Sequence, residues 1–174
     1  MDKIIHYTSR KKWKKIRQEG YLLPLSNPLW SNFWNRGKRK TGSLAELSSN
    51  LFNRYLYLAG IPEDSLPDWE EYGVMPYLKN HTTCEVKLSV PILHAEGAFV
   101  REHAYLTPKT FMEVLGFNMW EKCCFKEEEK VAFYVLVVKY LESTVHLREY
   151  QDQYLVPEVW LQQKTPICSI DIVK

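Results

Sequence analysis

The chain opens with an apolar run that leads into a basic segment, KIIHYTSRKKWKKIRQEG, residues 3–20. Residues 3–8, KIIHYT, predict a short strand. Ser9 stands at an N-cap position and Gly20 where a left-handed C-terminal cap is expected, so a helix is predicted over about 10–19. This strand and helix set the start of the fold, and they place a histidine near the end of the strand.

The composition is that of a folded domain of ordinary size. The chain has 174 residues, of which 45% are hydrophobic and 25% are charged, and this favours a single domain, residues 1–174. The longest apolar stretch falls well short of the ~20 residues that a spanning helix needs. No long apolar signal region follows the first methionine, so we expect neither a membrane partner nor a cleaved secretion signal.

The cysteines and the net charge bear on the cell compartment, on metal binding and on nucleic-acid binding. The four cysteines show neither a CxxC pair nor Cys/His ligand spacing, which predicts free thiols in a reducing compartment, a cytoplasmic location and no zinc site. The net charge of +2 is too small to indicate a nucleic-acid partner by itself, so only local clusters of charge can do so.

The rest of the chain alternates predicted strands, helices and loops. Strands near both ends with helices between them favour an α+β domain. The predicted elements are a long loop over 24–42, a helix over 43–52, a strand over 54–60, a turn-rich acidic loop over 61–73 with or without a short helix, strands over 83–92 and 97–106, a helix starting at Pro108, helix or coil over 126–132 with strand character after it, and strands over 155–162 and 167–174.

Three short motifs far apart in the chain carry a resemblance. The first is the opening strand, which ends in His6-Tyr7-Thr8 and leads to a helix and a glycine. The second is YLYLA (55–59), and the third is PEVWL (157–161) followed by TPICSIDI (165–172). In their order and spacing they resemble the motifs of the ADP-ribosyltransferase fold, and the opening is similar to that of the DNA-modifying toxin branch (DarT-like) and of the RNA 2′-phosphotransferases.

The resemblance implies an enzyme that transfers ADP-ribose from NAD, which would be its substrate, without a metal. It implies that Glu158 is the principal catalytic residue, holding the nicotinamide ribose and polarising or deprotonating the acceptor. It implies that His6 is the second catalytic residue and hydrogen-bonds a ribose hydroxyl, and that Thr8 anchors nearby groups. Tyr57, with Tyr55 in reserve, would stack on the nicotinamide ring.

The fold that the resemblance implies is α+β, with a split, mainly antiparallel sheet. An N-terminal helix would pack beside the strand that carries His6, and a cleft would lie between the two halves of the sheet. Two features depart from the family. Tyr7 stands where many relatives have a small residue, and the serine–threonine–serine signature of the arginine-modifying branch is absent.

Structural roles compete with each of these assignments. A strand histidine among apolar residues is easily satisfied as a neutral imidazole, so His6 can be a packing residue. Tyr55 and Tyr57 can be core or cross-strand residues. Glu158 is harder to explain structurally, because it lies between Pro157 and an apolar run.

Two basic segments favour contact with DNA or RNA. Cations interleaved with aromatic rings suit single strands, because the backbone takes the charge and the bases stack on the rings. A solvated basic face competes with this interpretation for the helix. In the loop, Arg36, Lys38 and Arg39 are also suited to the pyrophosphate of NAD. The residues assigned to nucleic acid are Lys11, Lys12 and Lys15 in the helix and Trp34, Lys38 and Lys40 in the loop, and those assigned to NAD are His6, Thr8, Tyr55, Tyr57, Arg36 and Arg39.

Two alternative functions stay open. One is a nucleic-acid-binding module that keeps the fold without turnover. The other is a metal-dependent nuclease, since Pro67-Asp68 followed by Glu85-Val86-Lys87 matches the PD-(D/E)xK form, although chance matches to it are frequent. The segment Arg101-Glu102-His103 is interpreted as a set of surface pairs.

Overall fold

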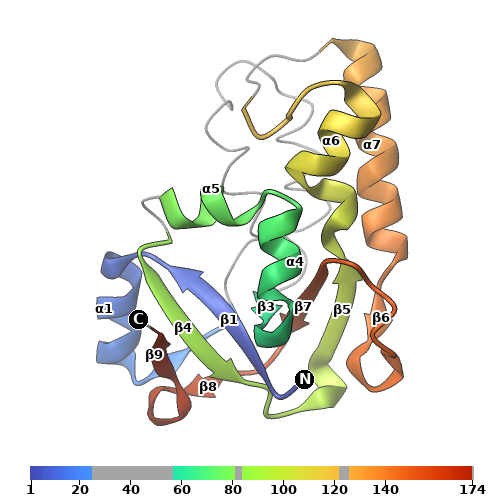
Figure 1. Cartoon of the computed structure of the whole chain (residues 1–174). Coiled ribbons are helices and arrows are strands. Elements are labelled where there is room, and N and C mark those ends of the chain that lie inside the picture. The colour runs from blue at the N-terminus through green and yellow to red at the C-terminus, as the bar shows by residue number, and fades with distance from the viewer. Residues whose placement is uncertain (25–56, 81–83, 122–125, 174) are drawn as a thin grey trace.

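A computed structural model describes residues 1–24, 57–80, 84–121 and 126–173. Its main sheet has seven strands in the order β6-β5-β7-β3-β1-β4-β9, and every neighbouring pair is antiparallel (Figure 1). The strands are β1 (Lys3–Thr8), β3 (Leu58–Pro62), β4 (Val86–Pro91), β5 (Ala98–Glu102), β6 (Val145–His146), β7 (Pro157–Leu161) and β9 (Asp171–Val173), and a two-stranded sheet pairs β2 (Tyr21–Leu22) with β8 (Thr165–Pro166).

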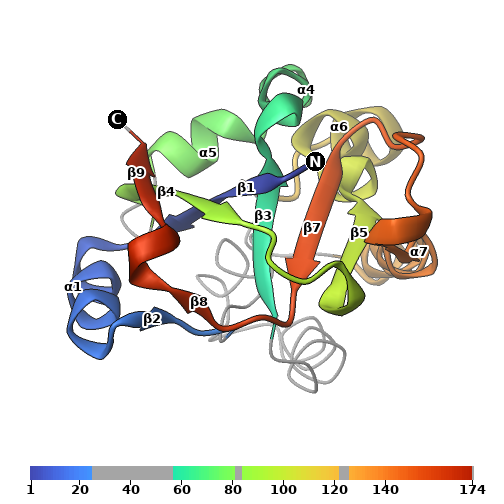
Figure 2. The same cartoon turned by 90° about the horizontal axis from the view of Figure 1, so that it is seen from below.

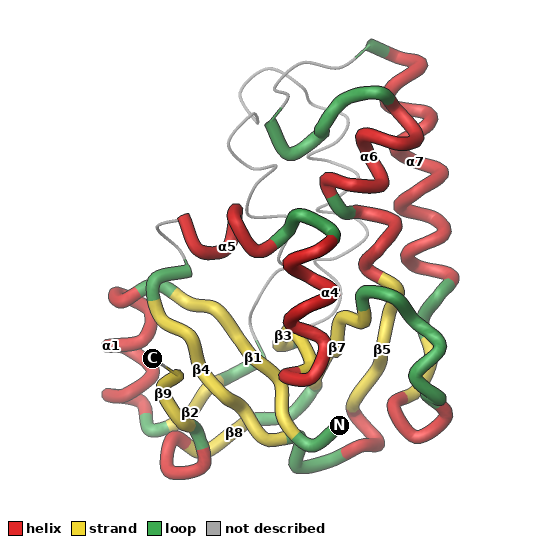
Figure 3. The backbone as a smooth tube through the Cα atoms, in the orientation of Figure 1, coloured by secondary structure: helices red, strands yellow, loops and turns green. Residues whose placement is uncertain are grey.

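Most of the described helices gather on one side of the strands, as the tube drawing in Figure 3 shows. The α+β class and the mainly antiparallel sheet are confirmed, whereas the expected split into two halves is not seen among the described residues, where one continuous seven-stranded sheet forms. None of these helices is long and apolar enough to cross a bilayer. The α-helices with described bounds are α1 (Arg10–Glu19), α4 (Leu66–Glu71), α5 (Met75–Asn80), α6 (Pro108–Leu115) and α7 (Glu127–Glu142).

The predicted start of the fold is confirmed. The Ser9 hydroxyl accepts a hydrogen bond from the backbone N–H of Lys12, and Gly20 closes α1 with a φ of 77°. Trp13 is the buried residue of α1. The predicted helix that starts at Pro108 is also confirmed, with Thr107 as its N-cap.

The sheet separates two hydrophobic cores. The first, which we call the helical core, joins Ile5, Tyr7, Ile61 and Trp160 to side chains of α4, α5, α6 and α7. The second, which we call the α1 core, joins Ile4, Leu58, Leu88 and Val159 to Trp13 of α1 and Leu22 of β2. Seen from below in Figure 2, β1 and β4 run across the direction of β3, β7 and β5.

Two predictions for the second half of the chain are wrong. The strand expected over 97–106 ends at Glu102, because the Glu102 carboxylate accepts from the backbone N–H of Ala104 and turns the chain into a 3₁₀ helix, His103–Leu106. The strand expected over 167–174 is a 3₁₀ helix, Ile167–Ser169, followed by the short β9.

The strand character expected after residue 132 is also wrong, because α7 is one continuous helix. Its composition of β-branched and aromatic residues favours a strand. The helix forms because Phe133, Leu136, Val137 and Tyr140 follow helical spacing and are all buried in the helical core. Tertiary packing has outweighed local propensity here.

Candidate active site around Glu158

Glu158 lies on β7, in the middle of the sheet, and its side chain is 0% exposed. On one side β7 pairs with β3, and on the other Glu158 pairs with Arg101 of β5. The strands with the three sequence motifs, β7, β3 and β1, are neighbours in the sheet. A buried carboxylate is costly to keep without hydrogen-bond donors, so its partners decide what it can do.

Both hydrogen bonds found for Glu158 end on the same oxygen. Nδ1 of His103 lies 3.1 Å from Oε2, and the Tyr140 hydroxyl donates to Oε2 at 2.6 Å. His103 and Tyr140 are themselves buried. Within the part of the chain that the structure describes, Oε1 of Glu158 has no hydrogen-bond partner.

These partners keep the carboxylate ionised. Burial alone would raise the pKa of Glu158, but the His103 imidazole and the hydrogen bonds from His103 and Tyr140, with a smaller contribution from the Trp160 side chain, outweigh it and lower the pKa below its usual value. Burial and the neighbouring carboxylate raise the pKa of the Tyr140 phenol, so this group stays protonated and keeps donating. The site thus holds a negative charge in a nearly dry environment.

Aromatic rings surround this carboxylate. The Trp69 ring stacks on His103, with centroids 4.5 Å apart, and its Nε1 donates to the carbonyl of Pro157 at 3.1 Å. The Arg101 guanidinium lies 4.5 Å from the centroid of Trp160. Tyr57 packs edge-on against Trp160 at 5.3 Å. The surroundings of the carboxylate therefore combine flat aromatic surfaces with the planar cation of Arg101.

His6 lies on the opposite face of the sheet from Glu158. Along β1, Ile5 belongs to the helical core and Ile4 to the α1 core, so His6 shares the face of Ile4. Along β7, Val159 belongs to the α1 core, so Glu158, one residue earlier, faces the helical core. The expected cavity shared by His6 and Glu158 is therefore not formed by the residues that the structure describes.

His6 links two neighbouring strands through a hydrogen bond from its side chain. Its Nδ1 donates to the carbonyl of Ala59 on β3 at 2.9 Å, which fixes the proton on Nδ1 because a carbonyl can only accept. Burial lowers the pKa of His6 to about 4, and nearby Lys12 adds to the effect. The imidazole is thus neutral near pH 7, and it ties β1 to β3 just beyond the pair Ile5–Ile61.

The other predicted site residues divide between the faces or lie outside the described residues. Tyr57 is on the Glu158 side of the sheet, where it packs in the helical core next to the proposed site. Thr8 is buried on the His6 side. The remaining predictions lie outside the described residues, namely Tyr55, Trp34, Arg36, Lys38, Arg39 and Lys40.

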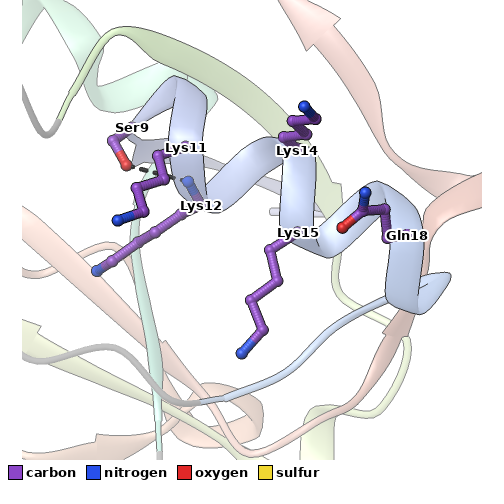
Figure 4. A pocket seen from close by; sticks show the side chains of 6 residues that line it. All are labelled: Ser9, Lys11, Lys12, Lys14, Lys15 and Gln18. Carbon is purple, nitrogen blue, oxygen red and sulfur yellow. Dashed lines mark hydrogen bonds between the residues drawn. The ribbon is translucent and has the colours of Figure 1, made fainter.

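A lysine-lined pocket of about 410 Å³ lies along α1 (Figure 4). The side chains of Lys11 and Lys12 extend to one side of the helix, whereas that of Lys14 points to another. Lys15 also pairs with Glu19 at 3.5 Å. This is the basic surface that the sequence assigned to nucleic acid, and its described lining consists of Ser9, Lys11, Lys12, Lys14, Lys15 and Gln18.

The residues of the nuclease pattern have other partners or are exposed. Glu85 pairs with Arg10, whose Nε lies 3.6 Å from Oε1 and whose backbone N–H donates to Oε2. Asp68 is an exposed residue of α4. Across the described ranges, no three His, Cys, Asp or Glu side chains are grouped so that they could hold a metal ion.

Two hydrogen-bond partners of Glu158, His103 and Tyr140, were not identified from the sequence. The prediction that Arg101, Glu102 and His103 form surface pairs is wrong, because Glu102 and His103 are buried and Arg101 is half-buried. The sequence did contain a signal that Glu102 is buried, because the alternation of Ala98, Val100 and Glu102 puts all three on one face of the strand, which is a core face. Tyr140 gave no signal, because its segment looked like a strand.

Comparisons with protein-family models, with curated proteins and with solved structures gave no match for this chain.

Proposed function

We propose that this chain transfers ADP-ribose from NAD, with Glu158 as its catalytic residue and a nucleic acid as the first acceptor to test. One observation carries the proposal: the motif glutamate is an ionised, buried carboxylate with one oxygen held and the other unpaired in the described part of the chain. A carboxylate with no structural partner for one oxygen is costly to retain for stability alone.

The chemistry needs a negative charge in a dry, oriented site. The bond between the nicotinamide nitrogen and the ribose C1′ breaks, and its electron pair leaves with nicotinamide and neutralises the pyridinium charge. Positive charge then develops on the ribose ring, where Glu158 would stabilise it. The acceptor oxygen or nitrogen forms the new bond to C1′, and its proton passes to Oε1 of Glu158.

The neighbouring side chains suit this substrate. Tyr57 and Trp160 offer flat surfaces for the nicotinamide ring once the Arg101 guanidinium, which lies over the Trp160 ring, moves aside. Because Glu158 is sealed from solvent, substrate binding requires the side chains around it to move apart. His6 has no part in this version of the site, since it faces the α1 core.

The test is nicotinamide release from NAD, measured by chromatography with and without single-stranded DNA or RNA. We expect release by the parent protein and a loss of at least ~100-fold in Glu158→Gln, the scale of one key electrostatic group. Glu142→Gln, which changes an exposed carboxylate on α7, should keep the parent rate. A parent protein with no release under any of these conditions would refute the proposal.

The lysine-lined pocket favours a second candidate function, single-strand binding without turnover. Neutralising its lysines should weaken the affinity for a single-stranded oligonucleotide and reduce the salt dependence, by about 0.7 in slope for each lost phosphate contact. Fluorescence anisotropy at several salt concentrations measures both quantities. The test variant changes Lys11, Lys12 and Lys15 to Ala, and the control variant changes the exposed Lys3, Lys139 and Lys164 to Ala. Equal loss of affinity in the two variants would mean that only the net charge of the protein matters.

A further inference from the structure

We infer that His103 and Tyr140 are positioning residues, which hold Glu158 by Oε2 and leave Oε1 as the oxygen that acts. We call the pair the clamp. Its part in the reaction rests on the proposed function, whereas the clamp itself rests on geometry. The two donors reach the same oxygen from different elements, His103 from the 3₁₀ helix after β5 and Tyr140 from α7.

The clamp is itself fixed by packing. Trp69 of α4 stacks on His103 with an angle of 23° between the ring planes, and Tyr140 meets His103 edge-on, with centroids 6.0 Å apart. Trp69 also bonds to the carbonyl of Pro157, the neighbour of Glu158 in the chain. A change in the carboxylate's direction would therefore have to move rings from α4 and α7 together.

Electrostatics make the clamp necessary. The ionisable groups that face the carboxylate are Arg101 from β5, His103 from the 3₁₀ helix and Tyr140 from α7. Burial alone favours the protonated form of Glu158, and the clamp, with a smaller contribution from Trp160, reverses that preference. Without either donor, burial should dominate, and Glu158 would hold a proton at a higher pH.

Both clamp bonds end on Oε2, so the reactive role falls to Oε1. In the proposed reaction this oxygen takes the acceptor's proton, and it must be unprotonated when the substrate binds. Loss of a clamp donor should therefore lower kcat more than it changes KM for NAD. It should also move the acidic limb of the pH–rate profile to higher pH.

The experiment titrates Glu158 by ¹³C NMR of protein labelled at the glutamate δ-carbon, with the signal assigned by its absence in Glu158→Gln. The variants are Tyr140→Phe and His103→Leu, each of which removes one donor to Oε2. We expect the titration midpoint of Glu158 to rise by about one pH unit or more in each variant. Tyr154→Phe removes a tyrosine hydroxyl that bonds to the carbonyl of Ser143, and it should leave the midpoint unchanged.

If both clamp variants fail to fold, the clamp can still be tested on the parent protein, in which His103 and Tyr140 are unchanged. In ¹⁵N-histidine spectra, His103 should show an Nδ1-bound proton in a strong hydrogen bond, and Glu158→Gln should move its resonance. Absence of a proton on Nδ1 would overturn the clamp.

The outcomes separate the clamp from the proposed function. A raised midpoint with no nicotinamide release by the parent supports the clamp and refutes the reaction. Release by the parent with an unchanged midpoint in both folded variants supports the reaction and overturns the clamp.

Discussion

Two buried ionisable residues from the sequence motifs have different roles in this molecule. Glu158 is charged and has one oxygen held by donors, whereas His6 is neutral and bonded to a backbone carbonyl. The contrast follows from their surroundings. The carboxylate stays ionised because donors outweigh its burial, whereas burial, aided by Lys12, keeps the imidazole neutral although its hydrogen bond to the Ala59 carbonyl raises its pKa. Only the first is suited to stabilise a developing positive charge.

His6 should make the fold sensitive to acid. Its pKa is about 4 in the folded protein against 6.5 in the unfolded chain, so the folded state binds fewer protons between these values. The stabilisation that depends on neutral His6 is complete above pH 6.5 and is lost as the pH falls toward 4. The shift corresponds to about 3 kcal/mol in free energy of unfolding.

Urea denaturation at about pH 7 and about pH 4.5 measures this effect. His6→Gln can still donate to the Ala59 carbonyl but does not titrate, so it should lose less stability across the interval than the parent does. Parallel curves for the two proteins would contradict the assignment of His6 as a buried neutral residue.

At the scale of elements, β1 and β3 approach each other closely. A Cβ built on Gly60 would lie 2.5 Å from Cδ1 and 3.0 Å from Cβ of Ile4, so only glycine fits this position. The close approach keeps β1 beside β3 and, through β3, at a fixed distance from β7. The relative position of the three motif strands therefore depends on one residue without a side chain.

Gly60→Ala should destabilise the fold by about 1–3 kcal/mol, because the added methyl must displace a fully buried isoleucine. The comparison variant is Gly97→Ala, whose Cβ would lie 3.3 Å from Cβ of Gln162, a contact that a shift of a few tenths of an ångström relieves. Thermal or urea denaturation of both proteins gives the difference. Equal stability of the two variants would be inconsistent with the close packing described for β1 and β3.

Much of the element pattern could be predicted from local signals, and the failures have a common cause. Ser9, Gly20 and Pro108 are cap or helix-start residues whose effect is local, so the two helices that they bound were predicted correctly. The segment of α7 has the composition of a strand, and only its burial against other elements makes it helical. The helical spacing of its buried residues is obscured in the sequence by the exposed apolar residues Val131, Tyr134 and Val135 of the same helix.

At the scale of the molecule, the sheet divides the predicted site between two cores. Glu158, Tyr57 and the clamp lie on the side of α4 and α7, whereas His6 and the lysine-lined pocket go with α1. The order and spacing of the three motifs predicted that distant segments would come together, and the structure places them on the neighbouring strands β1, β3 and β7. It could not give the face on which each side chain lies, since a shift of one residue in register reverses it.

The division between faces predicts how the two functions combine. If a nucleic acid binds at the lysine-lined pocket and ADP-ribose transfer occurs at Glu158, the Lys11, Lys12 and Lys15 triple variant should lose oligonucleotide affinity but keep nicotinamide release from NAD alone. Binding and release assays on the same preparation check this. Loss of release without oligonucleotide would indicate that α1 belongs to the NAD site.

The most direct test of the central claim compares nicotinamide release from NAD by the parent, Glu158→Gln and His6→Gln, each rate normalised to the folded fraction. The account predicts at least ~100-fold loss in Glu158→Gln and a rate within about three-fold of the parent in His6→Gln, because only the carboxylate faces the site. Equal, large losses in both variants would mean that the imidazole and the carboxylate share one cavity, and would contradict the two-sided arrangement described above.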